Sequence, residues 1–186
     1  MNMKTILTRT MQCIVVFIVS LGLVSVTSAQ NLQNVQIGLG GGGYLPTGDA
    51  DDVLDLGVAF HGTLLFGLDE MMQIEGGIGY WWLQFDEEFE DAADALGIDL
   101  DGSIIPITGG IRYQMAPQLH LDAGGGFYRV ELEAENLGLD ESETDFGVYG
   151  GAGYQMGPLD LVVRAHYPDF DDFYFTATVN YLFSIR

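Results

Sequence analysis

The chain has few positive charges and almost no thiol. Its only cysteine is Cys13 and its only lysine is Lys4, so four arginines face 27 acidic residues beyond residue 29. A protein without paired cysteines has no disulfide and no cysteine-based metal site. Nucleic acid binding depends on lysine and arginine side chains that neutralise phosphates. The composition therefore excludes a nucleic acid partner.

The first 29 residues have the three parts of a secretory signal peptide. Two basic residues come first, an apolar run follows over residues 14–26, and small residues end the segment at Ala29. The apolar run is shorter than the roughly 20 residues that a membrane-spanning helix needs. The sequence therefore predicts a cleavable signal peptide over residues 1–29 and a single exported domain over residues 30–186.

The exported part lacks long runs of apolar residues at helical spacing. Apolar residues instead alternate with small or polar ones, as they do from Leu54 to Phe66, and a two-residue period indicates β-strands. Most of these stretches reach the roughly 9 to 11 residues that a tilted strand needs to cross a membrane. The alternation predicts eight strands, at residues 35–45, 54–66, 71–85, 103–115, 118–130, 145–156, 159–167 and 173–185.

The connections between these strands alternate between short turns and long acidic loops. Three connections are short, and the other four cover residues 46–53, 86–102, 131–145 and 168–172. In an up-and-down barrel every second connection emerges at the same end, and outer-membrane barrels have short turns at one end and longer loops at the other. The four loops hold 21 of the 27 acidic residues and no basic residue. We therefore expect one strongly acidic rim.

Two further motifs complete this pattern: GGGYLPTGD leads from the first strand into its loop, and Tyr181-Leu182-Phe183 lies near the C-terminus. With them, the chain resembles the small eight-stranded outer-membrane β-barrels, the OmpA-like and OmpX-like group. The resemblance implies an all-β, eight-stranded antiparallel up-and-down transmembrane β-barrel in the cell outer membrane, surrounded by outer-membrane lipid. It also implies that Tyr181 and Phe183 form the signal that the barrel-insertion machinery recognises, although the family's pattern normally ends on the aromatic residue.

The strand alternation also predicts which polar residues face the interior. They are Gln73, Glu75, Thr108, Arg112, Gln114, His120, Asp122, Asp160, Arg164 and His166. Side chains fill the interior of an eight-stranded barrel, and a buried charge is costly unless it is paired. We therefore expect Glu75 and Asp122 to pair with Arg112 and Arg164 and to plug the lumen, as the resemblance to OmpA-type barrels also implies. Arg129 is not placed by this pattern: strict alternation puts it outside, whereas a bulge or the nearby loop boundary would give it other surroundings.

The sequence predicts no catalytic site and no cofactor. The serines beyond residue 29 are Ser103, Ser142 and Ser184, and none lies within a few residues of a histidine. Because a catalytic triad is defined by geometry and not by sequence order, this spacing does not exclude one. His166 and Asp169 near the rim are the best candidates for an acid–base pair.

The acidic loops predict loosely held divalent cations but no discrete metal site. Residues 98–102 resemble part of a calcium loop, yet the first ligand and the later glutamate of that motif are missing. Carboxylates at this density repel each other unless cations accumulate near them. A surface of this kind also suits a saline habitat, where salt screens the repulsion.

Apolar residues predict two local features. Phe85, Phe89, Ala92, Ala93 and Leu96 recur at helical spacing and predict a short amphipathic helix over the rim. Aromatic residues at strand ends suit the interfacial girdles of a membrane barrel. These girdle candidates are Tyr80, Trp81, Trp82, Tyr113, Tyr154, Tyr167, Tyr181 and Phe183.

The glycine-rich stretch GLGGGG at residues 38–43 matches the pattern G-x-G-x-x-G of dinucleotide-binding proteins. That fingerprint needs a helix after the glycines, and here a turn into another strand follows. We therefore interpret the match as chance. Gly38, Gly40 and Gly42 fall on the inward face, where we expect their missing side chains to leave room for the arginines of the far wall.

Together these patterns predict a non-enzymatic integral outer-membrane β-barrel with a polar, plugged lumen and acidic extracellular loops. Its expected role is structural or in surface interaction. Two alternatives stay open. One is a low-conductance porin-like pore, which requires the arginine network to open. The other is a soluble lipocalin-like carrier, which the charged residues on the inward face disfavour.

Overall fold

In the computed structural model, the described residues are 35–48, 50, 53–98, 100–134, 139–168 and 173–185. The predicted signal peptide lies outside them. So do Asp49, Asp51, Asp52, Asp99, Glu135, Asp169, Asp171, Asp172 and Arg186. Of Glu88, Asp94, Leu139 and Asp140 only the backbone is described.

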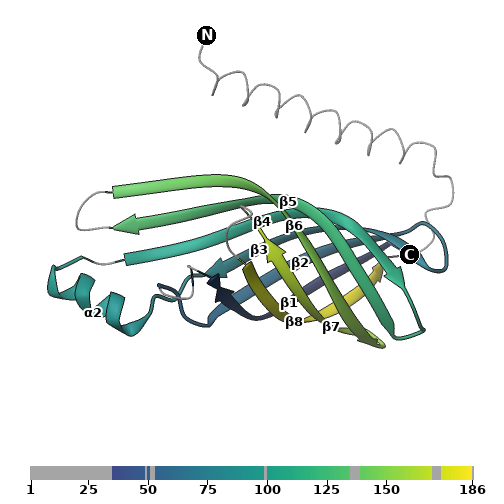
Figure 1. The fold of residues 1–186 in the computed structure, drawn as a ribbon. Coiled ribbons are helices and arrows are strands. Elements are labelled where there is room, and N and C mark those ends of the chain that lie inside the picture. Colours follow the sequence, from purple (N-terminus) through teal and green to yellow (C-terminus); the bar gives the residue numbers. More distant parts are fainter. Residues whose placement is uncertain are drawn as a thin grey trace, which may run out of the picture. The chain divides into compact units, whose positions relative to one another are not determined.

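Eight antiparallel strands form one closed barrel in which each strand pairs with its sequence neighbours and β8 pairs with β1 (Figure 1). The up-and-down order β1 to β8 confirms the predicted fold class. The elements are β1 (Val35–Thr47), β2 (Gly57–Gly67), β3 (Met72–Trp82), α2 (Glu87–Ala95), β4 (Leu100–Gln114), β5 (Leu119–Ala134), β6 (Leu139–Met156), β7 (Leu159–Tyr167) and β8 (Phe173–Ile185).

The apolar side chains cover the outside of the barrel and the polar ones fill the inside. On β8, Phe175 and Val179 are exposed on the outside, whereas Thr176 and Asn180 are buried inside the barrel. Successive side chains of a strand point to opposite faces, so this division follows from the two-residue alternation in the sequence. A continuous apolar exterior is the surface that a lipid bilayer requires.

Short turns lie at one end of the barrel, as predicted. Residues 68–71 join β2 to β3, residues 115–118 join β4 to β5, and residues 157–158 join β6 to β7. Gly157 has a φ of 60°, a left-handed conformation that glycine adopts without steric cost. The longer connections lie at the other end, which we call the outer rim.

The prediction of a third loop over residues 131–145 is wrong for most of that range. β5 continues to Ala134 and β6 begins at Leu139, and the two pair through the acidic stretch, for example Leu132 with Glu141. β4 also begins earlier than predicted, at Leu100. In Figure 1 these three strands extend past the ends of their neighbours at the outer rim. Many of the predicted loop acids therefore lie on strands.

The predicted helix in the second loop is confirmed as α2. Glu87 supplies a negative charge in the first turn, which is favourable at the positive end of a helix dipole. Gly97, with a φ of 71°, lies just beyond the last turn, where such residues commonly end helices. No helix in the described part of the chain is long and apolar enough to cross a membrane.

One of the predicted girdle residues is misplaced. Tyr80 and Trp82 are exposed on the outside of β3, but Trp81 is 2% exposed and points inward. It stacks on Tyr44 with ring centroids 5.9 Å apart and packs against Tyr174 at 6.0 Å. Trp81 therefore belongs to an aromatic layer inside the barrel, because its parity along β3 matches that of the buried Glu75 and not that of Trp82.

The inward glycines of β1 make room for neighbouring strands, and not for the arginines. A Cβ atom added at Gly38 would lie 2.8 Å from the Leu182 side chain, and one added at Gly42 would overlap the backbone of Ala177. The glycine beside an arginine is Gly151 on β6, where an added Cβ would lie 2.6 Å from Cγ of Arg164. The inward direction was predicted correctly, but the predicted neighbour was wrong.

Candidate functional site

Five charged residues form a connected layer inside the lumen. Each is at most 5% exposed, and they come from four strands. They are Glu75 on β3, Arg112 on β4, Asp122 on β5, and Asp160 and Arg164 on β7. Each has inward parity, so the strand alternation alone directs all five side chains to the same enclosed space.

Arg112 joins two walls of the barrel. Its Nε donates to Oε2 of Glu75 at 3.1 Å and its Nη1 donates to Oδ2 of Asp160 at 2.7 Å. The other carboxylate oxygen of Asp160 lies 2.8 Å from Nε2 of His120. All four side chains are at most 1% exposed, so these charge-assisted hydrogen bonds are shielded from water.

Arg164 makes the second set of contacts. Its Nη2 and Nε donate to Oδ2 of Asp122 at 2.9 and 3.1 Å, and Nη2 also donates to Glu75. Its Nη1 lies 3.4 Å from Nε2 of His61. The guanidinium carbon lies 5.2 Å from the ring centre of Tyr149, within the range of a cation–π contact.

The structure thus brings together all four predicted lumen residues, Glu75, Arg112, Asp122 and Arg164. Glu75 contacts both arginines, and Arg164 reaches it from β7, which is four strands away in a ring of eight. The ion pairs therefore connect opposite walls of the barrel. The sequence predicted Asp160 as inward but not as a partner of Arg112, because alternation fixes the face and not the position across the lumen.

A histidine and an aromatic layer lie next to these charges. His166 contacts the Tyr128 hydroxyl through Nδ1 at 2.9 Å and the Thr176 hydroxyl through Nε2 at 3.1 Å. The ring of Trp81 meets the imidazole edge-on, with centroids 4.9 Å apart. His166, the predicted acid–base candidate, is thus engaged on both ring nitrogens inside the lumen. Its proposed partner Asp169 lies outside the described residues.

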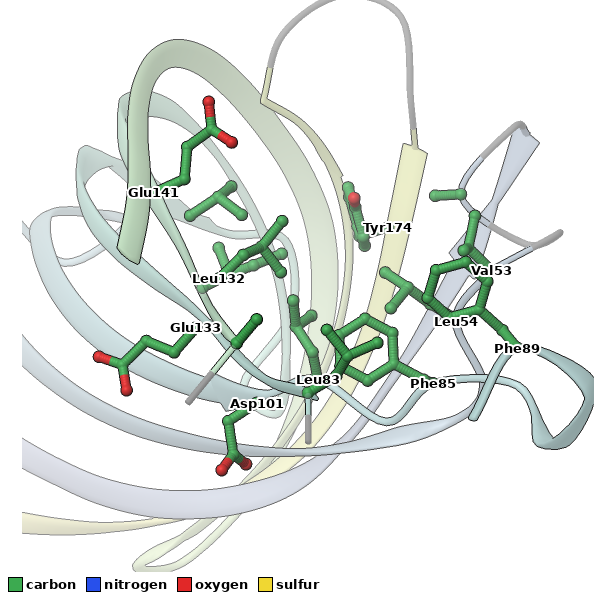
Figure 2. A pocket seen from close by; sticks show the side chains of 15 residues that line it. Val53, Leu54, Leu83, Phe85, Phe89, Asp101, Leu132, Glu133, Glu141 and Tyr174 are labelled. Atoms are coloured by element: carbon green, nitrogen blue, oxygen red, sulfur yellow. The ribbon is translucent and has the colours of Figure 1, made fainter. Parts of the chain in front are cut away.

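An apolar cavity of about 480 Å³ opens at the outer rim above the aromatic layer (Figure 2). Leu83, Ile104 and Tyr174 belong both to its lining and to the buried core cluster. The walls come from the first loop, the segment of α2, and the extended parts of β4, β5 and β6. No sequence pattern pointed to this cavity, because its lining residues come from six separate stretches of chain.

The outer rim is acidic, and Arg129 is placed on its outside. Arg129 lies on β5 and its Nε contacts Oε1 of Glu131 at 2.7 Å, with 54% of its own side chain exposed. The outward direction that strict alternation gives for Arg129 is therefore correct. Among the described residues, no group of three or more histidine or acidic side chains is arranged to hold a metal ion. Loosely held cations at the rim stay a prediction.

The two aromatic residues of the predicted insertion signal lie on the outside of β8, at the end of the barrel that carries the short turns. Tyr181 is 46% exposed and Phe183 is 49% exposed. Their ring centroids are 4.7 Å apart. This placement leaves both rings accessible from outside the barrel, and their recognition by the insertion machinery stays a prediction.

Comparisons with known proteins agree with this architecture. A family model described as outer membrane protein beta-barrel domain matches residues 16–183. A search of the curated proteins found no match. Among solved structures, Ail, the attachment invasion locus protein of Yersinia pestis, aligns over 81% of this chain and 98% of its own, with 18% identity and a TM-score of 0.54. Neisserial surface protein A aligns over 80% and 95%, with 10% identity and a TM-score of 0.51. At these identities the likeness is one of fold.

Proposed function

We propose that this chain, which belongs to the outer membrane protein beta-barrel domain family, is a non-enzymatic barrel with a closed lumen and an acidic surface for contacts outside the cell. The family places the protein in the outer membrane as an integral β-barrel. The alternative of a soluble lipocalin-like carrier is therefore wrong. The proposal concerns what the lumen and the rim do in that membrane.

The observation that carries the closed lumen is the ion network between opposite walls. Glu75 on β3 binds Arg164 on β7 and Arg112 on β4, and Arg112 also binds Asp160 on β7. Salt bridges that are nearly free of solvent contact are costly to open, because each charge would lose its partner in a poorly solvated space. The network therefore supports a plug, as expected for a barrel of this strand number.

The engagement of the histidines supports a non-enzymatic barrel. His120 and His166 are buried and bind partners inside the lumen, and Nε2 of His61 lies 3.4 Å from Arg164. A general base must reach the proton that it removes from a substrate. An imidazole that is bound to other side chains inside the lumen is not free to reach a substrate proton.

The acidity of the rim favours cationic or neutral contact partners. The structure of Ail holds the heparin analogue sucrose octasulfate, a polyanion. Most of the acidic residues that the structure describes lie at the rim, and its one described cation, Arg129, pairs with Glu131. Electrostatic complementarity sets which partners approach a surface and how fast, so a polyanion is disfavoured at this rim.

The closed lumen is tested by single-channel recording of the purified protein in planar bilayers. We expect no conductance steps from the wild type. Arg164→Ala removes the link between β3 and β7 and leaves Glu75 and Asp122 facing the gap, so we expect small, cation-selective steps from this variant. Arg112→Ala is expected to give steps of the same kind.

Arg129→Ala is the matched control, because it removes an arginine from the outside of the barrel, and it is expected to stay silent. Steady ohmic conductance of the wild type would contradict the plug and would favour the low-conductance pore. A heat-modifiable gel shift of each variant establishes that the barrel has folded before it is recorded.

A further inference from the structure

The cavity at the outer rim is built like a small-molecule site. Its volume of about 480 Å³ falls within the range of roughly 300–1,000 Å³ that is typical of ligand pockets. It is lined mainly by aliphatic and aromatic side chains. Its base rests on Ile104 and Leu83, which are 1% and 5% exposed, so the deepest part of the cavity is fixed by the packed core. The site is therefore preformed.

The walls of the cavity expose apolar side chains that lipid does not cover. Leu132 and Phe89 are each 43% exposed and line the cavity. Most other exposed apolar residues lie on the outer face of the strands, where lipid covers them. Leu132 has the inward parity of Val130 and Ala134, so lipid does not cover it. Apolar surface left in contact with water is unfavourable, and a concave patch of this kind marks a binding site.

Phe85 and Phe89 hold one wall of the cavity in place. Their rings stack with centroids 5.9 Å apart, and Phe85 forms a β-bridge with Leu54 of the first loop. Phe89 is on α2, so the helix contributes directly to the cavity. The helix in the second loop thus has a structural role, because it orients the Phe89 side chain toward the opposite wall, which β5 forms.

The mouth of the cavity carries carboxylates on its inner side. Three acidic residues line the cavity, and in Figure 2 the carboxylates of Asp101, Glu133 and Glu141 are all directed away from the apolar side chains. Glu141 pairs across the strands with Leu132, and Glu143 pairs with Val130, so both lie on the inward face of β6. The lining contains no lysine, arginine or histidine. The cavity thus combines an apolar interior with negative charge at its mouth and no positive charge in its lining.

We propose that this outer cavity binds a small cationic amphiphile, with its aliphatic or aromatic body inside and its ammonium group next to Glu141. The apolar interior selects the body by burial of its surface. Glu141 and the acidic rim around it select a positive head group and disfavour a carboxylate or phosphate. The inference goes beyond the closed-lumen function, since it does not depend on whether the lumen conducts.

The experiment uses the full-length mature protein in nanodiscs of zwitterionic lipid and three probes with the same chain: octyltrimethylammonium, octanol and octanoate. Methyl NMR signals report binding. Ile104 lies at the base of the cavity, whereas Ile78 and Ile107 are exposed on the outside of the strands and report partitioning into the bilayer. We expect a saturable shift at Ile104, an affinity order of cation above alcohol above carboxylate, and no saturation at Ile78.

Two variants test the head group and one tests the cavity. Glu141→Gln is expected to weaken octyltrimethylammonium about fivefold, the effect of one partly solvated ion pair. Glu70→Gln is the matched control, because Glu70 is an exposed glutamate in the short turn between β2 and β3 and does not line the cavity. It is expected to leave the affinity unchanged. Ala134→Phe places a ring in the cavity and is expected to weaken all three probes tenfold or more.

Several results would overturn the proposal. The absence of a saturable shift at Ile104 would show that the cavity binds none of these molecules. Equal affinities for octyltrimethylammonium and octanol, or equal effects of Glu141→Gln and Glu70→Gln, would remove the cationic head group and leave a neutral apolar ligand. Since both glutamine variants change only an exposed side chain, the test does not depend on the folding of Ala134→Phe.

Discussion

Two arginine–glutamate pairs of this barrel have similar geometry in different surroundings. In the lumen, Nε of Arg112 lies 3.1 Å from Glu75, and both side chains are 1% exposed. At the rim, Nε of Arg129 lies 2.7 Å from Glu131, but the side chains are 54% and 32% exposed. The rim pair is closer, yet water and salt screen it, and exposed pairs contribute little to stability.

The comparison shows that burial and not distance decides what these charges do. A buried charge that loses its partner stays in a poorly solvated site, so the lumen residues depend on one another. A rim charge that loses its partner is solvated. Identical residue types therefore close the barrel in one region and only set the sign of the surface in the other.

The largest effect is expected from removal of an arginine in the lumen. Arg164→Met leaves Glu75 and Asp122 with fewer partners and is expected to lower the free energy of unfolding by about 3–5 kcal/mol. Arg129→Met at the rim is expected to change it by less than about 1 kcal/mol. Urea titration of both variants, followed by the gel shift between folded and unfolded barrel, measures the difference. Similar losses for the two variants would contradict the role of burial.

An intermediate effect on stability is expected from adding a methyl group on the inner or the outer face of the barrel wall. Gly42→Ala adds a methyl group that overlaps the backbone of Ala177, and overpacking of this kind costs about 1–3 kcal/mol. Gly76→Ala adds the same group where no atom lies within 4 Å. We expect Gly76→Ala to be neutral or to stabilise by up to about 1 kcal/mol, because alanine loses less entropy on folding. The same urea titration compares them, and a reversed order would refute the inward assignment of Gly42.

The smallest effect is expected from the salt dependence of the rim pair. A double-mutant cycle of Arg129→Met and Glu131→Gln is expected to give a coupling of about 0.2–1 kcal/mol at low salt. At 1 M salt the screening length is about 3 Å, so this coupling should fall toward zero. The corresponding cycle of Arg164→Met and Glu75→Gln is expected to keep its value, because that pair is buried. If salt lowered both coupling energies equally, burial would not explain the difference between the lumen pair and the rim pair.

The sequence predicted the barrel, the eight strands and the inward charges because all of these depend on the two-residue alternation. Phe175 and Val179 alternate with Thr176 and Asn180 within one strand, and that local signal directs each side chain to lipid or lumen. The partners of each charge were less predictable. Arg112 binds Asp160, 48 positions further along the chain, and no local pattern specifies such a contact.

The extension of β5 and β6 was missed for a physical reason. Past the membrane an outer face needs no apolar residues, so Glu131 and Glu133 occupy outward positions of the kind that Phe127 and Leu121 occupy lower down on β5. The alternation itself continues, with Leu132 and Ala134 facing inward. A search for two-residue periodicity that accepts a charged outer face would have found this strand. The apolar cavity would still have been missed, because it depends on how the separate stretches meet.

The link across the lumen constrains the order in which the barrel can be completed. Glu75 and Arg112 are 37 positions apart and lie on adjacent strands, so they can meet as soon as β3 and β4 pair. Arg164 is 89 positions from Glu75 and on the opposite wall. A sheet that lacks β7 therefore leaves Glu75 and Asp122 with Arg112 as their one arginine in this layer, and β7 supplies the second arginine together with Asp160. The ion network thus makes an unfinished barrel less stable than a closed one.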